Sequence, residues 1–207
     1  EVFATKGDTL RQAERYQEAV TTYSKALELY AQDHSSRWFV HYTRGISHHK
    51  LDQWPSAEAD FRAALALRPD HPQILNYLGY SLVERGEKLN EALGMIETAA
   101  AARPENGAIV DSLGWVYFQL GRYDEAVVHL ERAASLEPVD PVINDHLGDA
   151  FWAVGREIEA RFQWQRALSF DPTEEEALRI RDKLSRGLDL VLLDEGLSPI
   201  SIASDDT

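Results

Sequence analysis

Residues 113–138 read LGWVYFQLGRYDEAVVHLERAASLEP, and residues 147–172 read LGDAFWAVGREIEARFQWQRALSFDP. The two stretches share two glycines seven residues apart, two alanines seven residues apart and a closing proline, all offset by 34 residues. Self-similarity at a period of this length is typical of solenoid proteins, in which each repeat is one supersecondary unit. The chain is therefore first analysed as an array of repeats.

The same small residues recur along most of the chain. The packing glycines are Gly7, Gly45, Gly79, Gly114 and Gly148; the alanine pairs are Ala19 and Ala26, Ala57 and Ala64, Ala92 and Ala99, Ala126 and Ala133, and Ala160 and Ala167; the closing prolines are Pro69, Pro104, Pro138 and Pro172. Small residues in amphipathic helices let two backbones approach closely. A second glycine, such as Gly121, can end the first helix, and the proline stops the second. Each unit is predicted to be an antiparallel helix pair that must stack on its neighbours to bury both faces.

This unit resembles the tetratricopeptide repeat, whose pattern has Leu-Gly, an aromatic residue, two alanines around a large residue and a closing proline. The fourth and fifth units match it almost completely. The third has one extra residue between 86 and 90, the second has Arg44 and His48 in place of the leucine and the aromatic residue, and the first has Lys6, Leu10 and Ala31 at pattern positions. The resemblance implies an all-α, right-handed superhelical solenoid with repeats at 1–33, 38–71, 72–106, 107–140 and 141–174. The later units also look like the C-terminal part of a longer bacterial protein of this family.

The segments around the repeats have their own signals. Polar residues 33–37 predict a longer loop or a slightly extended helix. Thr173 and Glu176 fit a capping box, so residues 175–187 are expected to form a capping helix that ends at Gly187. The tail, 188–207, is expected to be a flexible end or to pack on the cap, with docking into a groove of this or a neighbouring molecule as the alternative.

Composition excludes several classes of function. The net charge of -14 disfavours nucleic acid, because no basic stripe interrupts it. The absence of cysteine excludes disulfides and thiolate chemistry, but it leaves the compartment open. No apolar run reaches the roughly 18 residues of a membrane span, and no signal peptide is apparent. Because the chain starts at Glu1 and its only methionine is Met95, we expect an upstream part, in which address signals could lie.

In the tetratricopeptide repeat family the first helix of each repeat lines a concave groove. One stripe along that helix, at i, i+4 and i+7, is implied to face the groove. The candidate binding residues on this stripe are Tyr42, Asn76, Tyr80, Asp111, Trp115, Phe118, Asp145, Asp149 and Trp152. The aromatic rings predict apolar anchoring of a peptide, and the aspartates predict a preference for Lys, Arg or a free amine. In the alternative interpretation, the rings pack against neighbouring first helices.

The sequence gives little reason to expect catalysis or metal binding. Asp111 and Asp145 recur with the repeat step of 34 residues, so repetition and solvation explain them without acid–base chemistry. His34, His41, His48 and His49 are close in sequence but not spaced four apart on one helix face, as a zinc site would require. No phosphate-binding glycine loop or hydrolase motif occurs, and no cofactor is expected.

The sequence therefore predicts a non-enzymatic scaffold that binds a protein or peptide carrying basic and apolar residues. The alternatives are a homo-oligomerisation module, an accessory domain of a larger enzyme, and an exported assembly factor. The partner and the localisation are not indicated by the sequence.

Overall fold

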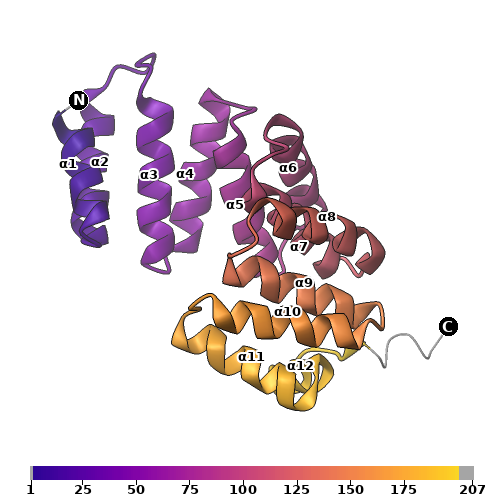
Figure 1. Cartoon of the computed structure of the whole chain (residues 1–207). Coiled ribbons are helices and arrows are strands. Elements are labelled where there is room, and N and C mark those ends of the chain that lie inside the picture. The colour runs from indigo at the N-terminus through magenta and orange to yellow at the C-terminus, as the bar shows by residue number, and fades with distance from the viewer. Residues whose placement is uncertain (1, 201–207) are drawn as a thin grey trace. The chain divides into compact units, whose positions relative to one another are not determined.

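The computed structural model describes residues 2–200, and all of their regular structure is helical (Figure 1). The helices are α1 (Val2–Gln12), α2 (Tyr16–Leu29), α3 (Arg37–Lys50), α4 (Trp54–Leu67), α5 (Pro72–Glu84), α6 (Leu89–Ala102), α7 (Gly107–Gln119), α8 (Tyr123–Leu136), α9 (Pro141–Ala153), α10 (Glu157–Ser169), α11 (Glu174–Arg186) and α12 (Leu188–Asp194). Consecutive helices pack as pairs, most extensively α3 with α4, α7 with α8 and α9 with α10. The predicted all-helical repeat fold is confirmed.

The chain forms two compact units, which are described separately. Unit 1 ends at Leu78 and unit 2 begins at Gly79, so the boundary falls inside α5. Unit 1 holds α1 to α4 with the first half of α5. Unit 2 holds the remainder of α5 and α6 to α12.

Each helix pair is closed by a glycine that faces a large side chain of the second helix. A Cβ atom on Gly148 would lie 2.4 Å from Cδ1 of Trp164, and one on Gly7 would lie 2.4 Å from Cε1 of Tyr23. Gly45 faces Phe61 in the same way. The paired alanines Ala19, Ala26, Ala57, Ala64, Ala92, Ala99, Ala126, Ala133, Ala160 and Ala167 are all fully buried. The small residues thus permit close packing of two backbones, as the sequence predicted.

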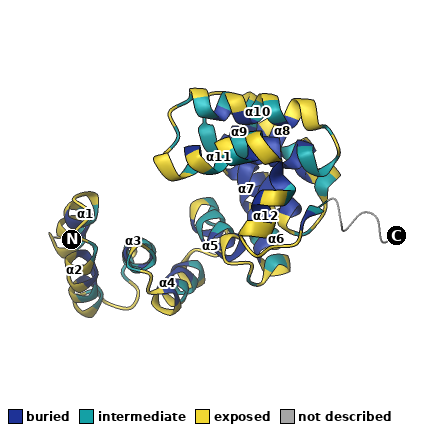
Figure 2. Cartoon of the chain, turned by 90° about the horizontal axis from the view of Figure 1, so that it is seen from below, coloured by how far each residue is buried: buried dark blue, intermediate teal, exposed yellow. Residues whose placement is uncertain are grey.

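Burial within unit 2 is greatest along α7. Eleven of its 13 residues are buried, and its ribbon is dark blue over most of its length (Figure 2). One of its sides packs on α6 and α8, and α9 covers another. The turn after α7 passes through Gly121 at a φ of 73°, in the left-handed region that ends a helix with little strain at glycine.

The connection between α2 and α3 is a loop, one of the two forms expected for residues 33–37. His34 stacks on Tyr30 with ring centroids 4.0 Å apart. The Arg37 guanidinium donates hydrogen bonds to the carbonyl oxygens of Leu27 and Tyr30. These bonds satisfy carbonyls at the end of α2 that have no partner within the helix.

The C-terminal end of unit 2 has one more helix than the sequence predicted. The capping box at Thr173 and Glu176 is present and starts α11. The segment expected to be a tail begins with α12, which packs against α11 through buried Leu188, Val191 and Leu192. Residues 201–207, the remainder of that segment, lie outside the described residues. Within residues 2–200, no helix combines the length and the apolar character that spanning a bilayer requires.

Candidate functional site

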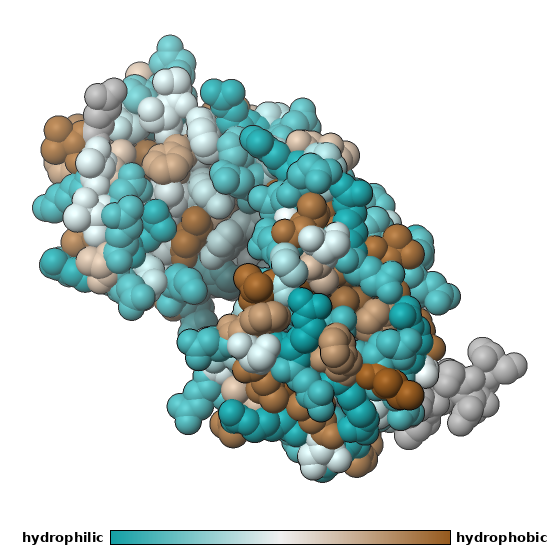
Figure 3. All heavy atoms as spheres, viewed as in Figure 1, coloured by the Kyte–Doolittle hydropathy of each residue, from teal (hydrophilic) through white to brown (hydrophobic). Residues whose placement is uncertain are grey.

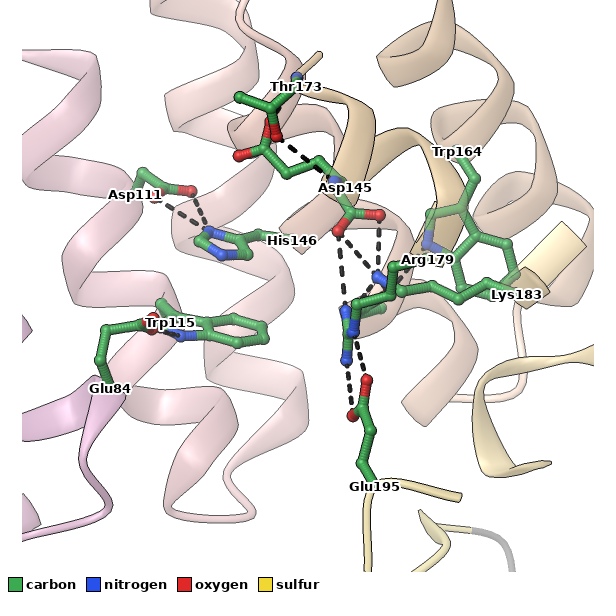
Figure 4. Close-up of polar contacts among 12 residues, drawn as sticks. Glu84, Asp111, Trp115, Asp145, His146, Trp164, Thr173, Arg179, Lys183 and Glu195 are labelled. Carbon is green, nitrogen blue, oxygen red and sulfur yellow. Dashed lines mark hydrogen bonds and ion pairs between the residues drawn. The ribbon is translucent and has the colours of Figure 1, made fainter. Parts of the chain in front are cut away.

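Three rings form a stack on first helices of unit 2, and two of them, Trp115 and Phe118, belong to residues expected to face the groove. Trp115 lies between Phe118, at a centroid distance of 4.8 Å, and His146, at 3.9 Å, and all three rings are nearly parallel. The indole Nε1 of Trp115 donates a hydrogen bond of 2.9 Å to Glu84 (Figure 4). Trp115 and Phe118 are each only 8% exposed. The stack therefore joins α7 to α9 and offers little free ring surface.

Asp111 is paired within the chain. Nδ1 of His146 lies 3.0 Å from each of its carboxylate oxygens, and both side chains are buried. Burial by itself disfavours protonation of this ring, but the Asp111 carboxylate, together with the charges of Asp145 and Asp149, raises the pKa of His146. The result is a buried contact between α7 and α9 beside the ring stack.

Asp145 and Asp149 share the ammonium group of Lys183. Nζ lies 2.8 Å from both oxygens of Asp145 and 2.7 Å from Oδ1 of Asp149, which also accepts a 2.8 Å hydrogen bond from Trp164. The Arg179 guanidinium approaches the same two carboxylates at 3.9 and 3.7 Å (Figure 4). Burial raises the pKa of Asp145 although Lys183 opposes this effect. Two cations of α11 thus meet two carboxylates of α9.

These contacts change the interpretation of the three aspartates. The sequence led us to expect open carboxylates that would attract a ligand's cations. In the structure their partners are His146, Lys183 and Arg179 of this chain. The side chain of Lys183 is fully buried, because its long apolar stem can run through the interface while its ammonium reaches the carboxylates.

Trp152 is partly buried and contacts the last part of unit 2. Its Nε1 donates a 2.8 Å hydrogen bond to Asp189 of α12, and its ring lies 5.5 Å from that of Trp164. Gly187, between α11 and α12, lies directly against the indole. Part of this candidate anchor is therefore covered by the chain itself.

Tyr80 has a different environment, in which carboxylates predominate. Burial raises the pKa of its hydroxyl, and the negative charges of Glu84, Asp111 and Glu176 add to the effect. These carboxylates come from α5, α7 and α11. Tyr80 is partly exposed, and Glu84 is exposed. We call Tyr80 with Glu84, Asp111 and Glu176 the acidic patch.

The two remaining candidates belong to unit 1. The Tyr42 ring makes an edge contact with Tyr77 at 6.0 Å and also lies near Phe61. Asn76 is partly buried, and its Oδ1 has no hydrogen-bond partner among the described residues. The structure thus brings together seven of the nine candidates in unit 2 and places the other two in unit 1.

Sequence reasoning missed a buried carboxylate in unit 1. Asp60 accepts two 2.7 Å hydrogen bonds from Arg44 and lies 2.9 Å from Nδ1 of His41, with His48 at 3.9 Å. Burial opposes its ionisation, but the bonds from Arg44 and His41 hold the pKa of Asp60 below its ordinary value. The available signal was its position next to Phe61 and between the ladder alanines of α4. Among the described residues no His, Asp and Glu side chains group as they would to hold a metal ion.

Sequence reasoning also missed the role of Lys183. In the sequence, Ala177, Ile180 and Leu184 are spaced as an apolar stripe of α11. Lys183 lies three residues after Ile180 and therefore on the same helix face. That spacing was the signal for a cation directed toward the packed side of the capping helix.

Comparison with known proteins gives a consistent picture. Sequence profiles described as tetratricopeptide or TPR repeats match residues 1–33, 38–71 and 114–155. The TPR repeat-containing protein PA4667 of Pseudomonas aeruginosa is 29% identical over 126 residues, which are 61% of this chain and 21% of that protein. The chain spans about a fifth of the length of the curated relatives it matches.

Solved structures of repeat proteins are similar over most of this chain. MamA from AMB-1 is 25% identical with a TM-score of 0.69, and the match covers 83% of this chain and 98% of that one. TTC0263, described as a thermophilic TPR protein of Thermus thermophilus, is 25% identical with a TM-score of 0.66, covering 90% and 97%. The same helix-pair repeat therefore recurs in both.

Proposed function

Because this chain belongs to the tetratricopeptide repeat family, whose fold supports protein–protein interaction scaffolds, we propose that it binds a protein partner at the acidic patch of unit 2. The partner segment carries Lys, Arg or a free amine beside apolar residues. The observation that carries this proposal is the partly exposed side chain of Tyr80, whose hydroxyl pKa is raised first by burial and then by the negative charges of Glu84, Asp111 and Glu176.

Charge supports a basic segment. Glu84 and Glu176 are at least partly exposed and attract a ligand cation, whereas Asp111 already lies against His146 within the chain. The phenol ring of Tyr80 offers a flat surface for an alkyl stem or a guanidinium group. Asp145 and Asp149 already pair with Lys183, so the patch is the better site for a ligand's cation.

The ring stack and His146 hold two carboxylates of the acidic patch in place. Trp115 holds Glu84 through its indole Nε1, and Asp111 is held by His146. Two of the three carboxylates are thus fixed before a ligand arrives, which lowers the entropic cost of binding. In this proposal Trp115 acts as a support, and the contact with the ligand is made by Tyr80.

Proteins of this fold are generally non-enzymatic, and we propose the same for this chain. Asp111, Asp145 and Asp149 each lie against a cation of the chain, so none is arranged as a free general base toward a substrate. Direct binding of one peptide class by the intact protein is the property to measure.

The test is selection of peptides from a random displayed library on the intact protein, followed by affinity measurement. We expect enrichment of Lys and Arg, and affinity that falls with ionic strength. Glu84→Gln with Glu176→Gln keeps the hydrogen-bonding shape and should weaken binding about tenfold, which corresponds to about 1.4 kcal/mol. Asp124→Asn with Glu157→Gln, at exposed positions on α8 and α10, is the matched charge control. Enrichment of acidic peptides, or an equal effect of both double variants, would contradict the proposal.

Self-association is the second candidate, and an apolar surface on α1 favours it. An open pocket there is lined by Val2, Thr5, Lys6, Thr9 and Leu10, and Val2 is 80% exposed. Sedimentation of the intact protein and of Val2→Asp tests this contact. A monomer at all concentrations would eliminate it.

A further inference from the structure

The joint between α11 and α12 requires glycine for two reasons. Gly187 has a φ of 85°, in the left-handed region, where residues with a Cβ atom are strained. A Cβ atom there would also lie 2.5 Å from Cη2 of Trp152. The chain therefore reverses beside Trp152 and returns as α12 along α11.

Helix α12 contacts unit 2 with one apolar face only. Leu188, Val191 and Leu192 are buried, whereas Leu190 and Leu193 are 46% and 47% exposed. A helix of seven residues is far below the length that is stable alone in water. Its conformation therefore depends on the surface to which it is docked.

The polar contacts of α12 and the turn after it all involve carboxylates. Asp189 accepts a 2.8 Å hydrogen bond from Trp152, Asp194 lies 2.7 Å from Arg186, and Glu195 lies 2.7 Å from Arg179. The side chains that donate to these carboxylates lie on α9 and α11, and the backbone N–H of Ile200 also donates a 2.6 Å hydrogen bond to Asp189. This surface of Trp152, Arg179 and Arg186, which we call the α11 surface, presents an indole N–H and two guanidinium groups to the carboxylates of α12. Arg179 also lies 3.9 Å from Asp145 and 3.7 Å from Asp149, and Arg186 also pairs with Asp182.

The seam between α11 and α12 is not sealed. An open pocket runs along it, lined in part by Leu178, Arg179, Val191 and Glu195, and Leu178 is 60% exposed. In Figure 3 hydrophobic atoms are interspersed with hydrophilic ones at this end of the molecule. Part of the α11 surface therefore stays open while α12 is docked.

We propose that the α11 surface is a binding site for an acidic amphipathic helix and that α12 is its resident, exchangeable occupant. The partner is a helix of another protein that carries apolar residues three or four apart, flanked by Asp or Glu. This site goes beyond the acidic patch, because its residues differ and its charge preference is the opposite.

The argument for this partner is the chain's own segment. Residues 188–195, LDLVLLDE, show which chemistry the surface accepts: carboxylates for the indole N–H and the two guanidinium groups, and apolar side chains between them. The tether gives α12 an effective concentration on the order of millimolar. A partner therefore needs additional contact, and the open pocket beside Leu178 provides a place for a larger side chain.

The experiment uses a fluorescent peptide of residues 187–200 and the full chain. In the variant Leu188→Asp with Val191→Asp, α12 should leave the surface, and the peptide should bind at least tenfold more tightly than to the wild type. Adding Arg179→Gln and Arg186→Glu should abolish this gain, whereas Arg103→Glu, an exposed arginine after α6, should not. Hydrogen exchange of α11 shows in each case that the cap is still folded.

A second variant covers the case in which the first unfolds. Asp189→Asn with Glu195→Gln puts no charge into the interface and should raise peptide affinity to an intermediate level, with faster amide exchange confined to α12. The proposal would be overturned if the peptide did not bind although the amides of α11 stay protected from exchange. It would also be overturned if substitution of Arg179 and Arg186 did not change peptide affinity. If the wild type dimerises and the variant Leu188→Asp with Val191→Asp does not, the occupant of the surface is a second copy of this chain and the proposal is wrong. Glu84→Gln, on α5 and away from the α11 surface, should leave this binding unchanged, which separates the test from that of the acidic patch.

Discussion

Nζ of Lys183 lies 2.7 Å from Oδ1 of Asp149, and both side chains are buried. The same ammonium group also contacts Asp145, so one lysine of the capping helix neutralises two carboxylates of the last repeat. A buried ion pair contributes little net stability compared with apolar residues of the same volume, but breaking it is costly.

Lys183→Met should therefore lower the free energy of unfolding by about 3–5 kcal/mol, since it removes the one cation in direct contact with Asp145 and Asp149 and leaves them with the more distant Arg179. In the Asp145→Asn, Asp149→Asn background the same change should cost much less. Chemical denaturation of the four proteins gives the coupling energy. Equal costs in both backgrounds would mean that the lysine acts only through its apolar stem.

Ala126→Leu and Ala160→Leu should each lower the free energy of unfolding by about 1–3 kcal/mol, because both alanines are fully buried between paired helices. Ala102→Leu, at an exposed position of α6, is the matched control and should have little effect. Thermal or urea denaturation checks this. Unchanged midpoints for both buried variants would refute the packing role of the ladder.

His146 should titrate above its ordinary pKa and His129 below it. Burial of His129 lowers its pKa, whereas Asp111 raises that of His146. The proton on His146 therefore contributes stability that is complete below about pH 6.5 and is lost as the pH rises through the raised folded pKa.

Asp111→Asn removes the main cause that raises this pKa, so burial should then lower the pKa of His146 and reverse the sign of its contribution. Proton NMR titration of the imidazole signals, together with urea denaturation from about pH 5.5 to 9, measures both effects. A His146 titration that does not respond to Asp111→Asn would refute the assignment.

The first helix pair should open before the fourth. Only two of the 11 residues of α1 are buried, against eleven of 13 in α7. Local opening is easiest where few apolar groups are buried. Native-state hydrogen exchange should show faster exchange in α1 and α2 than in α7 and α8, and the opposite order would refute this prediction.

The fold could be predicted because its packing rule is local in sequence. Gly114 faces Leu130 and Gly148 faces Trp164, each within a single helix pair, so one repeat contains the whole signal. The capping box at Thr173 is equally local. For these elements one sequence was sufficient.

The surface chemistry could not be predicted, because it depends on contacts between repeats. Lys183 is 34 residues from Asp149 and 38 from Asp145, and nothing in the spacing of the aspartates indicates a lysine in the cap. From the sequence alone, an aspartate on the stripe that faces outward is expected to be exposed to solvent, because the side chain that pairs with it lies in another part of the chain. The segment LDLVLL is also too short for periodicity to show that it would return to Trp152.

The pairing of each packing glycine with a bulky residue of the same hairpin has a consequence for how such a chain can change length. Because Gly148 and Trp164 belong to one repeat, deleting or duplicating that repeat as a whole keeps the glycine and the ring that packs on it together. A cut inside the repeat would separate them and place the ring against the glycine of another repeat, which packs on a different side chain, such as Leu130 at Gly114. Repeat boundaries are therefore the points at which this architecture tolerates recombination, and each hairpin behaves as an interchangeable cassette.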